Sequence, residues 1–244
     1  MSHTPGIRQA RKQQTRQSLL DEGLRLLEHQ NLSSLGLREL TRAVGVSPAA
    51  FYRHFPDMAD LGVALVGESL GSLHAVIRAT LADGADDPSP DALIDRTVAV
   101  TAAYVDEHRP HIRFIARERH GGVRAVREAI AAELARFTGE VAEGLAAQPA
   151  SAGWTEEDLR VLAGLYVDHM VTTASALLEA SAEDAGHAAD TADTADAAAP
   201  SAPTDPTSDR SPDRAAARER IMREARLGMR IISVGRRHWL DPES

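Results

Sequence analysis

The sequence predicts an all-α protein, with a three-helix helix-turn-helix unit at residues 1–56 and a larger helical domain at residues 57–244. Three observations predict this class. Apolar residues recur at helical spacing in the long segments. No run alternates β-branched and polar residues between hairpin turns. Glycine and proline stand at the positions where they begin or end helices. Together these patterns predict roughly nine helices.

The first four helices are marked by their boundary residues. Gly45 can take the left-handed conformation that ends a helix, and Ser47-Pro48 is a favoured N-cap followed by a favoured first helical residue. Asp57 can cap the helix that comes after it. The predicted helices are 7–29, 37–44, 48–55 and 58–82.

The later helices follow from the same periodicity, with one interruption. Residues 181–213 are rich in Ala, Asp, Thr, Ser and Pro and contain no large apolar side chain, so we expect a disordered insertion there. Its role is not indicated by its composition, and a spacer is the simplest interpretation. The remaining predicted helices are 90–107, 110–119, 122–147, 155–180 and 212–239.

Composition excludes several classes of protein. The chain has 244 residues, 43% of them apolar and 26% charged, which is typical of globular proteins. The absence of cysteine excludes disulfides, thiolate zinc sites and cysteine nucleophiles. No uninterrupted apolar stretch is long enough to span a bilayer, and the first twenty residues do not resemble a signal peptide. We therefore expect a cytoplasmic chain without membrane contact.

The formal net charge of −9 is unevenly distributed. Residues 1–60 hold eight basic and six acidic side chains, whereas residues 179–213 hold nine acidic side chains and one arginine. The N-terminal segment is thus locally basic despite the acidic total. It is the part of the chain suited to a polyanionic partner.

The helices at 37–44 and 48–55, joined at Gly45, have the spacing of a helix-turn-helix, whose second helix can enter the major groove of DNA. Phe51 and Phe55 are four residues apart and should pack inward, which leaves Tyr52 and Arg53 pointing elsewhere. Arg53 is the first candidate for a base contact, because a guanidinium pairs with the two acceptors of guanine. The candidate DNA-binding residues are Arg38, Thr41, Ser47, Pro48, Ala49, Ala50, Tyr52, Arg53 and His54.

The stretch LRELTRAVGVSPAAFYRHF closely resembles the DNA-binding helices of the TetR family of transcriptional regulators. The resemblance covers residues 8–66, and the helical remainder agrees with that family's ligand-binding domain. It implies a homodimer on an inverted-repeat operator, with Tyr52 as a phosphate contact. The segments FYRHFPDMADLGVALVGES, IRFIARERHGG and LGMRIISVGRRHW resemble the branch containing FabR and DesT, which represses unsaturated fatty acid synthesis and senses acyl thioesters.

This chain departs from the family pattern at two capping and contact positions. The cap of the second helix, commonly Thr or Ser, is Gly36, which is a weaker cap. The lysine that many relatives place at the start of the fourth helix is Met58, so one phosphate contact is absent. Affinity for DNA should then depend more on the basic residues of the first helix, namely Arg8, Arg11, Lys12 and Arg16.

Two apolar stripes on the late helices suit a four-helix dimer interface. They comprise Leu162, Tyr166, His169, Met170, Thr173 and Leu177 on one helix, and Leu227, Ile231, Val234 and His238 on the last. An acyl chain would need an apolar tunnel, with Arg113, Arg117 or Arg119 at its mouth for a phosphate-rich carrier. The candidate ligand-binding residues are Val98, Thr101, Tyr104, Phe114, Arg117, Tyr166 and Met170.

Three hypotheses follow from the sequence. The first is a homodimeric, ligand-responsive repressor of lipid genes whose effector is long-chain acyl-CoA. The second is a regulator of the same architecture that senses a drug-like or other hydrophobic small molecule. The third is an all-α enzyme or scaffold that does not bind DNA. Neither a nucleophile elbow nor a phosphate or dinucleotide loop is present, and we expect no metal, no cofactor and no enzymatic activity.

Overall fold

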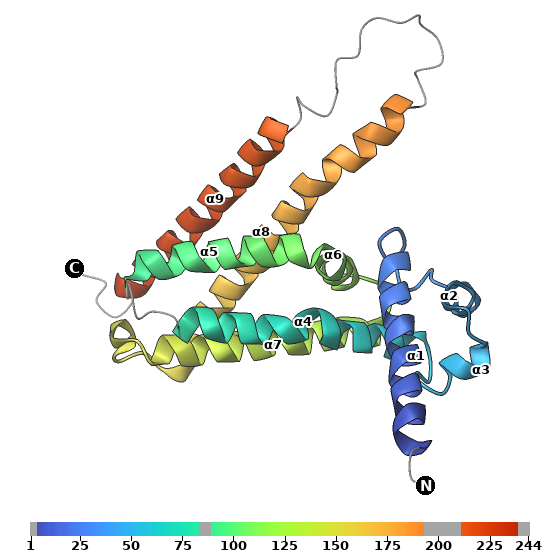
Figure 1. The fold of residues 1–244 in the computed structure, drawn as a ribbon. Helices are drawn as coiled ribbons and strands as arrows, with labels where there is room; N and C mark the ends of the chain where they lie inside the picture. The colour runs from blue at the N-terminus through green and yellow to red at the C-terminus, as the bar shows by residue number, and fades with distance from the viewer. Residues whose placement is uncertain (1–3, 83–88, 193–210, 239–244) are drawn as a thin grey trace, which may run out of the picture. The chain divides into compact units, whose positions relative to one another are not determined.

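The computed structural model describes residues 4–82, 89–192 and 211–238, which form nine α-helices and one short 3-10 helix, with no strand among them. The all-α prediction is confirmed. In chain order the helices are α1 (Thr4–Leu26), α2 (Leu37–Val44), α3 (Pro48–Phe51), α4 (Met58–Ala82), α5 (Pro90–Glu107), α6 (Arg109–Glu118), α7 (Arg124–Ala146), η1 (Pro149–Ser151), α8 (Glu156–Ala192) and α9 (Ser211–His238) (Figure 1).

The chain divides into two compact units. Unit 1 comprises residues 1–76 and 108–137, and unit 2 comprises residues 77–107 and 138–244. This division differs from the sequence-based boundary at residue 56. It assigns the first part of α4, α6 and the first part of α7 to the same unit as the three N-terminal helices.

Unit 1 is built around the apolar face of α1. Leu19, Leu20, Leu24 and Leu27 are all buried there. A side-chain carbon at Gly23 would lie 3.4 Å from Leu61 Cδ2, an ordinary contact distance, so this position of α1 faces α4. The hydrophobic contribution is large, because each fully buried leucine stabilises the fold by about 1.5–3 kcal/mol.

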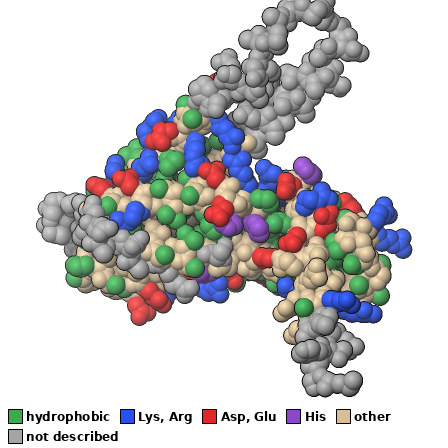
Figure 2. All heavy atoms as spheres, in the orientation of Figure 1, with side chains coloured by type: hydrophobic (Ala, Val, Ile, Leu, Met, Phe, Trp, Pro, Cys, Tyr) green, Lys and Arg blue, Asp and Glu red, His purple; other side chains and the backbone are tan. Residues whose placement is uncertain are grey.

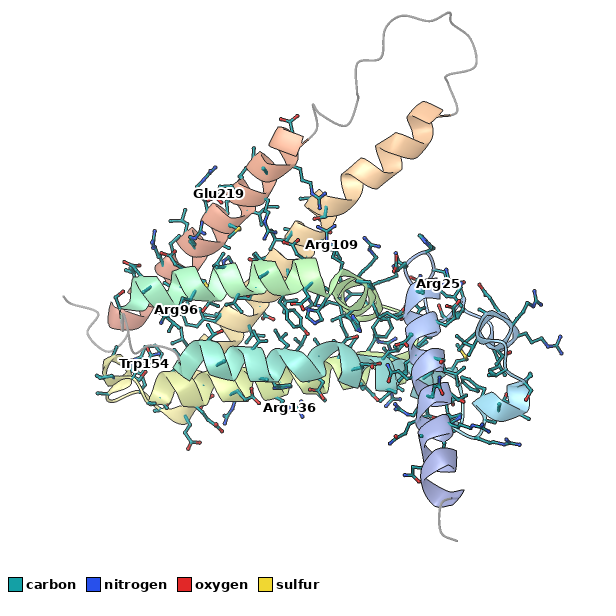
Figure 3. The ribbon with its side chains drawn as sticks, in the orientation of Figure 1. Arg25, Arg96, Arg109, Arg136, Trp154 and Glu219 are labelled. Atoms are coloured by element: carbon teal, nitrogen blue, oxygen red, sulfur yellow. The ribbon has the colours of Figure 1, made fainter. Side chains whose placement is uncertain are left out.

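Unit 2 is a bundle in which α5 and α9 pack together and both pack on α8. One apolar cluster joins Ile94 and Val98 of α5 to Ala225 and Met229 of α9. A second cluster around Leu159 and Leu162 includes Trp154, whose side chain is drawn in Figure 3. The core of this unit therefore lies among α5, α7, α8 and α9.

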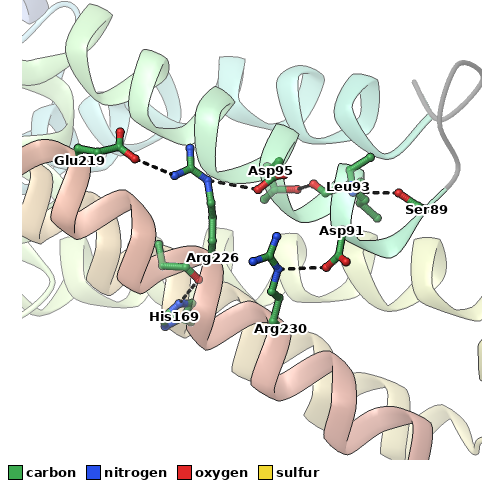
Figure 4. Close-up of polar contacts among 11 residues, drawn as sticks. Ser89, Asp91, Leu93, Asp95, His169, Glu219, Arg226 and Arg230 are labelled. Atoms are coloured by element: carbon green, nitrogen blue, oxygen red, sulfur yellow. Dashed lines mark hydrogen bonds and ion pairs between the residues drawn. The ribbon is translucent and has the colours of Figure 1, made fainter.

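Ion pairs line the contact between α5 and α9. Arg226 Nε lies 3.2 Å from Asp95 Oδ1, and Arg230 Nε lies 3.0 Å from Asp91 Oδ1 (Figure 4). The two arginines are four residues apart, as are the two aspartates, so both pairs form along one helix face. Their partly exposed position limits each pair to a small contribution, typically below about 1 kcal/mol.

Helices α8 and α9 approach closely at His169. The ring Nε2 lies 2.9 Å from the carbonyl oxygen of Ala225, and a side-chain carbon at Gly228 would overlap the ring. The imidazole thus occupies space that only a glycine on α9 leaves open.

Helices α1, α3, α7 and α8 have bounds that differ from the predicted ones by more than one residue. Helix α3 ends at Phe51, and residues 52–54 continue in turns, in which the amide of Arg53 donates to the carbonyl of Ala50 at 3.3 Å and the amide of His54 donates to that of Phe51 at 2.8 Å. Helix α8 extends to Ala192, into the segment expected to be disordered, and α9 begins at Ser211. Residues 193–210 of that segment, and Trp239 at the end of the last predicted helix, lie outside the described residues.

One described segment, Glu156–Ser181 of α8, is long and apolar enough to cross a membrane by length and composition alone. A third of its most apolar window is buried, and the helix packs against α5 and α9. The core helix of a folded domain passes the same test, so this segment is weak support for a membrane span.

Candidate nucleic-acid interface

The turn between α2 and α3 is fixed by its glycine and its serine. Gly45 has φ +76°, and its N–H donates to the carbonyl of Arg42 at 3.2 Å. The next amide, that of Val46, donates to the carbonyl of Thr41 at 2.9 Å. Ser47 Oγ then accepts from the amide of Ala50 at 3.2 Å and caps α3. Both caps are those that the sequence predicted.

Residues 47–55, which comprise α3 with its cap and the turn after it, are called the α3 segment. One side of this segment is buried. Phe51 is fully buried and Phe55 nearly so, with ring centroids 5.6 Å apart. The guanidinium carbon of Arg16 in α1 lies 5.2 Å from the centroid of the Phe55 ring, which is a cation–π distance. The aromatic pair thus fixes α3 in unit 1 and brings a basic residue of α1 beside it.

The opposite side of this segment is exposed. Tyr52 is 58% exposed although it is an aromatic residue, and Arg53 beside it is also exposed. Ser47, Pro48 and Ala49 are exposed at the start of α3, as is Arg38 on α2. Six of the nine predicted DNA-binding residues are therefore accessible: Arg38, Ser47, Pro48, Ala49, Tyr52 and Arg53.

The structure corrects the prediction for Thr41. Its side chain is 2% exposed, and its hydroxyl donates to the carbonyl of Leu37 at 2.9 Å. Thr41 and Leu40 are the two buried residues of α2, so both lie on the side of the helix that is covered. Ala50 is half-buried, so its contact area is smaller than expected.

His54 is half-buried, and its Nδ1 has no hydrogen-bond partner among the described residues. Burial lowers the pKa of the imidazole, and the positive charges of Lys12, Arg16 and Arg53 lower the pKa further. Three cations from α1 and the α3 segment are therefore close enough to act on one ring. Figure 2 shows Lys and Arg side chains at the edge of the molecule where α2 and α3 lie. The side chain of Arg8 lies outside the described residues.

The predicted ligand-binding residues are divided between the two units. Val98 and Tyr104 are buried in unit 2, Thr101 is half-buried there, and Tyr166 and Met170 pack on the cluster around Val98. Phe114 and Arg117 belong to unit 1. The structure thus brings together Val98, Tyr166 and Met170 in one apolar cluster.

Arg117 has a different role from the one predicted. It does not stand ready for a phosphate-rich carrier, because its guanidinium donates to the carbonyls of Leu27 and Gln30, both at 3.0 Å. Arg113, a further candidate for that role, has Nη1 3.8 Å from Glu28 Oε2. These contacts could not be predicted from local patterns, since the partners lie about ninety residues apart in the chain.

The α8 stripe predicted for the dimer interface faces its own protomer. Leu162, Thr173 and Leu177 are each at most 5% exposed. The exposed apolar residues of this helix are Val161 (62%) and Leu165 (53%) instead. On α9 the predicted stripe does face outward, with Leu227, Ile231 and Val234 at 58%, 64% and 51% exposed; the side chain of His238 lies outside the described residues.

Among the described residues, no group of three or more His, Asp or Glu side chains is placed to hold a metal ion. The turn that follows the four-residue α3 exposes an aromatic hydroxyl and a guanidinium in neighbouring positions, on Tyr52 and Arg53.

Residues 19–65 match the sequence model of the family described as bacterial regulatory proteins, tetR family. The matched segment runs from the middle of α1 through α2 and α3 into α4, so it contains the turn at Gly45 and the exposed face of α3. This match supports a DNA-binding transcriptional regulator with a TetR-type N-terminal domain. Members of that family are regulators rather than enzymes, which agrees with the prediction of a non-enzymatic protein.

Proposed function

We propose that this protein is a homodimeric, ligand-responsive repressor that binds an inverted-repeat DNA operator and acts in the cytoplasm. The observation that carries the DNA-binding part is the two-sided α3 segment. Phe51 and Phe55 are buried while Tyr52 and Arg53 are exposed. Arg16 of α1 lies beside the Phe55 ring, and the charges of Lys12 and Arg16 act on His54. Such a segment can enter the major groove while the flanking cations meet phosphates.

Each exposed residue has a role in this proposal that follows from its chemistry. Arg53 reads guanine by donating to O6 and N7, and a good bidentate pair discriminates by about 1–3 kcal/mol. Tyr52, Ser47 and Arg38 contact phosphates, which fixes the register of the helix on DNA without reading sequence. Pro48 and Ala49 have short side chains and allow close approach of the backbone. His54 lies beside this face as a phosphate neighbour.

A dimer is supported by the exposed apolar residues of unit 2. Val161 and Leu165 on α8 and Leu227, Ile231 and Val234 on α9 are all more than half exposed in the single chain. Helices α8 and α9 pack on each other, so two copies can pair these helices about a two-fold axis. A single α3 segment gives little specificity, whereas a two-fold dimer places two of them on repeated half-sites.

We propose a hydrophobic small molecule as the effector, with long-chain acyl-CoA as the first compound to test. The proposal is supported by the resemblance of residues 51–69, 112–122 and 227–239 to regulators of unsaturated fatty acid synthesis. Arg117 donates to backbone carbonyls, so it is no longer part of the carrier proposal. A drug-like effector on the same apolar cluster, formed by Val98, Tyr166 and Met170, is the alternative.

Titration against random-sequence duplex DNA at two salt concentrations tests the DNA-binding proposal. A protein that neutralises several phosphates loses affinity steeply as salt rises, and no binding at low salt would refute the proposal. On a selected operator, Arg53→Ala should relax base preference, whereas Tyr52→Phe should weaken all sequences alike. The opposite pattern would reverse the two roles.

The effector is tested by measuring release of the operator by long-chain acyl-CoA, free CoA and free fatty acid. The acyl-thioester proposal expects release by acyl-CoA alone, because an effector shifts DNA affinity only by its different affinity for the two conformations of the protein. Equal effects of all three compounds would refute it, and release by unrelated hydrophobic compounds would favour the alternative.

A further inference from the structure

The connection between α1 and α2, residues 27–36, is held by two neighbouring side chains of α6. Arg117 Nη1 donates to the carbonyls of Leu27 and Gln30, and its Nη2 donates to the carbonyl of Glu28 at 3.4 Å. These carbonyls follow the C-terminus of α1, where the last carbonyls lack helical partners and the helix dipole favours a cation. Arg117 therefore acts as a cap for α1 that is supplied by another helix.

Glu118 holds the same connection from its other side. Its Oε1 accepts from the amide of Leu32 at 2.8 Å, and the carboxylate is only 1% exposed. Leu32 is itself 2% exposed, and its side chain lies over Gly62 of α4, where any side-chain carbon would overlap it. Both the backbone and the side chain of Leu32 are thus fixed inside unit 1.

The second oxygen of Glu118 shows how closely this group is enclosed. Oε2 has no hydrogen-bond partner among the described residues and lies over Gly121, where a side-chain carbon would overlap it. Leaving a buried carboxylate oxygen without a partner is unfavourable for stability. A charged acceptor nevertheless makes a stronger bond to the Leu32 amide than a neutral amide would, which favours a fixed position for this connection.

The opposite end of α1 lies at the candidate DNA interface. Arg16 is beside Phe55, and Lys12 is close enough to affect His54. Helix α1 has 23 residues and is therefore about 34 Å long, so a change of angle at its C-terminus displaces its basic half. Helices α1 and α6 are in contact within unit 1 (Figure 1).

We propose that Arg117 and Glu118 are positioning residues for DNA binding. By holding residues 27–32, they set the direction of α1, so that Lys12 and Arg16 meet phosphates while Arg53 is in the groove. The inference rests on the proposed DNA-binding function. The chain returns to unit 1 at His108, and α6 begins at the next residue. The inference adds that α6 controls the number of DNA phosphates that α1 contacts.

Substitutions around Glu118 test this role in the full-length protein. Glu118→Ala removes the acceptor, Glu118→Gln retains one, and Gly121→Ala displaces the carboxylate without removing it. Gly122→Ala is the matched control, because its new carbon would lie at an ordinary 3.4 Å from Ser33 Cβ. Circular dichroism identifies the temperature range in which each variant is folded.

Hydrogen exchange at the Leu32 amide is the first measurement. Glu118→Ala and Gly121→Ala should speed exchange by about 10- to 100-fold, the factor that corresponds to one charge-assisted hydrogen bond. Glu118→Gln should speed exchange less than Glu118→Ala does, because it keeps a neutral acceptor, and Gly122→Ala should remain near the wild-type rate. An unchanged rate in Glu118→Ala would overturn the inference, because the carboxylate would then not hold this amide.

The salt dependence of binding to random-sequence duplex DNA is the second measurement. If α1 loses its fixed direction, its cations contact fewer phosphates, and the slope of log Kd against log salt should decrease by about 1–2. Glu118→Ala, Gly121→Ala and Arg117→Lys should show this decrease. The single ammonium of a lysine cannot replace the two guanidinium nitrogens that donate to the carbonyls of Leu27, Glu28 and Gln30. Glu118→Gln, which keeps an acceptor, should retain a steeper slope than Glu118→Ala does.

A purely structural role would have a different result. It would lower the melting temperature and the folded fraction but leave the salt dependence of DNA binding by the folded protein unchanged. That result would overturn the inference and leave the proposed function intact. Absence of DNA binding by the wild-type protein would overturn both the inference and the proposed function. The two failures are therefore distinguishable in one set of titrations.

Discussion

Ile231 on α9 offers the sharpest test of the proposed dimer. The residue is 64% exposed in the single chain, and it lies between Leu227 and Val234 in the outward-facing stripe. Ile231→Ala removes three carbon groups while retaining a good helix former, so the helix itself should persist. Any loss of association is then due to the removed apolar surface.

The magnitude follows from that exposure. Burial of one carbon group is worth about 0.8 kcal/mol, so three groups that are 64% exposed contribute about 1.5 kcal/mol on burial in each protomer. A two-fold interface contains the residue twice, which gives about 3 kcal/mol for the dimer. At 1.4 kcal/mol per tenfold change, the dissociation constant of the dimer should rise about 100-fold.

Sedimentation equilibrium over a dilution series measures that constant directly. Val63→Ala on α4 is the matched control, because Val63 is an exposed apolar residue, at 37%, on a different helix. The control should leave the dimer unchanged, and Ile231→Ala should also lose affinity for an inverted-repeat operator. The reasoning is refuted if the wild-type chain is monomeric throughout, or if the two variants dissociate at the same concentration.

Further predictions concern the caps, the α8–α9 contact and the pH dependence of stability. Gly36→Ser should stabilise α2 by a few tenths of a kcal/mol, because Gly36 has φ −83° and open space around it. Gly45→Ser should instead lower the free energy of unfolding by roughly 1–2 kcal/mol, because Gly45 has φ +76°. Chemical denaturation that gives both changes the same sign would refute this. Gly228→Ala should lower the free energy of unfolding by about 1–3 kcal/mol, because the new carbon overlaps the His169 ring. In a double-mutant cycle, His169→Ala should recover part of that loss. Strictly additive free-energy changes would argue against the contact. Burial lowers the pKa of His111, with a smaller effect from a neighbouring histidine, so the unfolded chain takes up this proton at a higher pH than the folded chain does. The stabilising contribution is therefore present above about pH 6.5 and is lost as pH falls below it, and His111→Gln should flatten the fall in urea midpoint between about pH 7.5 and about pH 5.5; an unchanged fall would exclude this residue as its source.

The local elements could be predicted because their causes are local. The bounds of α2 and α4 agree with the periodicity and the caps, and Gly45 has the left-handed φ that its position indicated. The burial of Phe51 and Phe55 follows from their four-residue spacing, which places both on one face whatever that face contacts. The exposure of Tyr52 and Arg53 follows from the same geometry, so the candidate DNA-binding face was largely visible before the structure.

Contacts between distant segments could not be predicted in this way. The hydrogen bonds of Arg117 join residues about ninety positions apart, and an arginine in a helical sequence has the same pattern whether it binds solvent, a carrier or a carbonyl. The interpretation of Thr41 failed because a threonine can satisfy its hydroxyl within its own helix and then be buried.

The orientation of α8 shows the same division between sequence and structure. The helix is apolar on two faces, and periodicity does not say which of them meets the rest of the chain. The packing of α9 against it, including His169 over Gly228, buries the face with Leu162 and leaves Val161 and Leu165 exposed. The sequence by itself determined which residues share a helix and where most helices end, because capping and periodicity act within a few residues. Only the tertiary structure decided which face is covered and which side chain of α6 holds the end of α1, because those choices depend on segments that folding brings together.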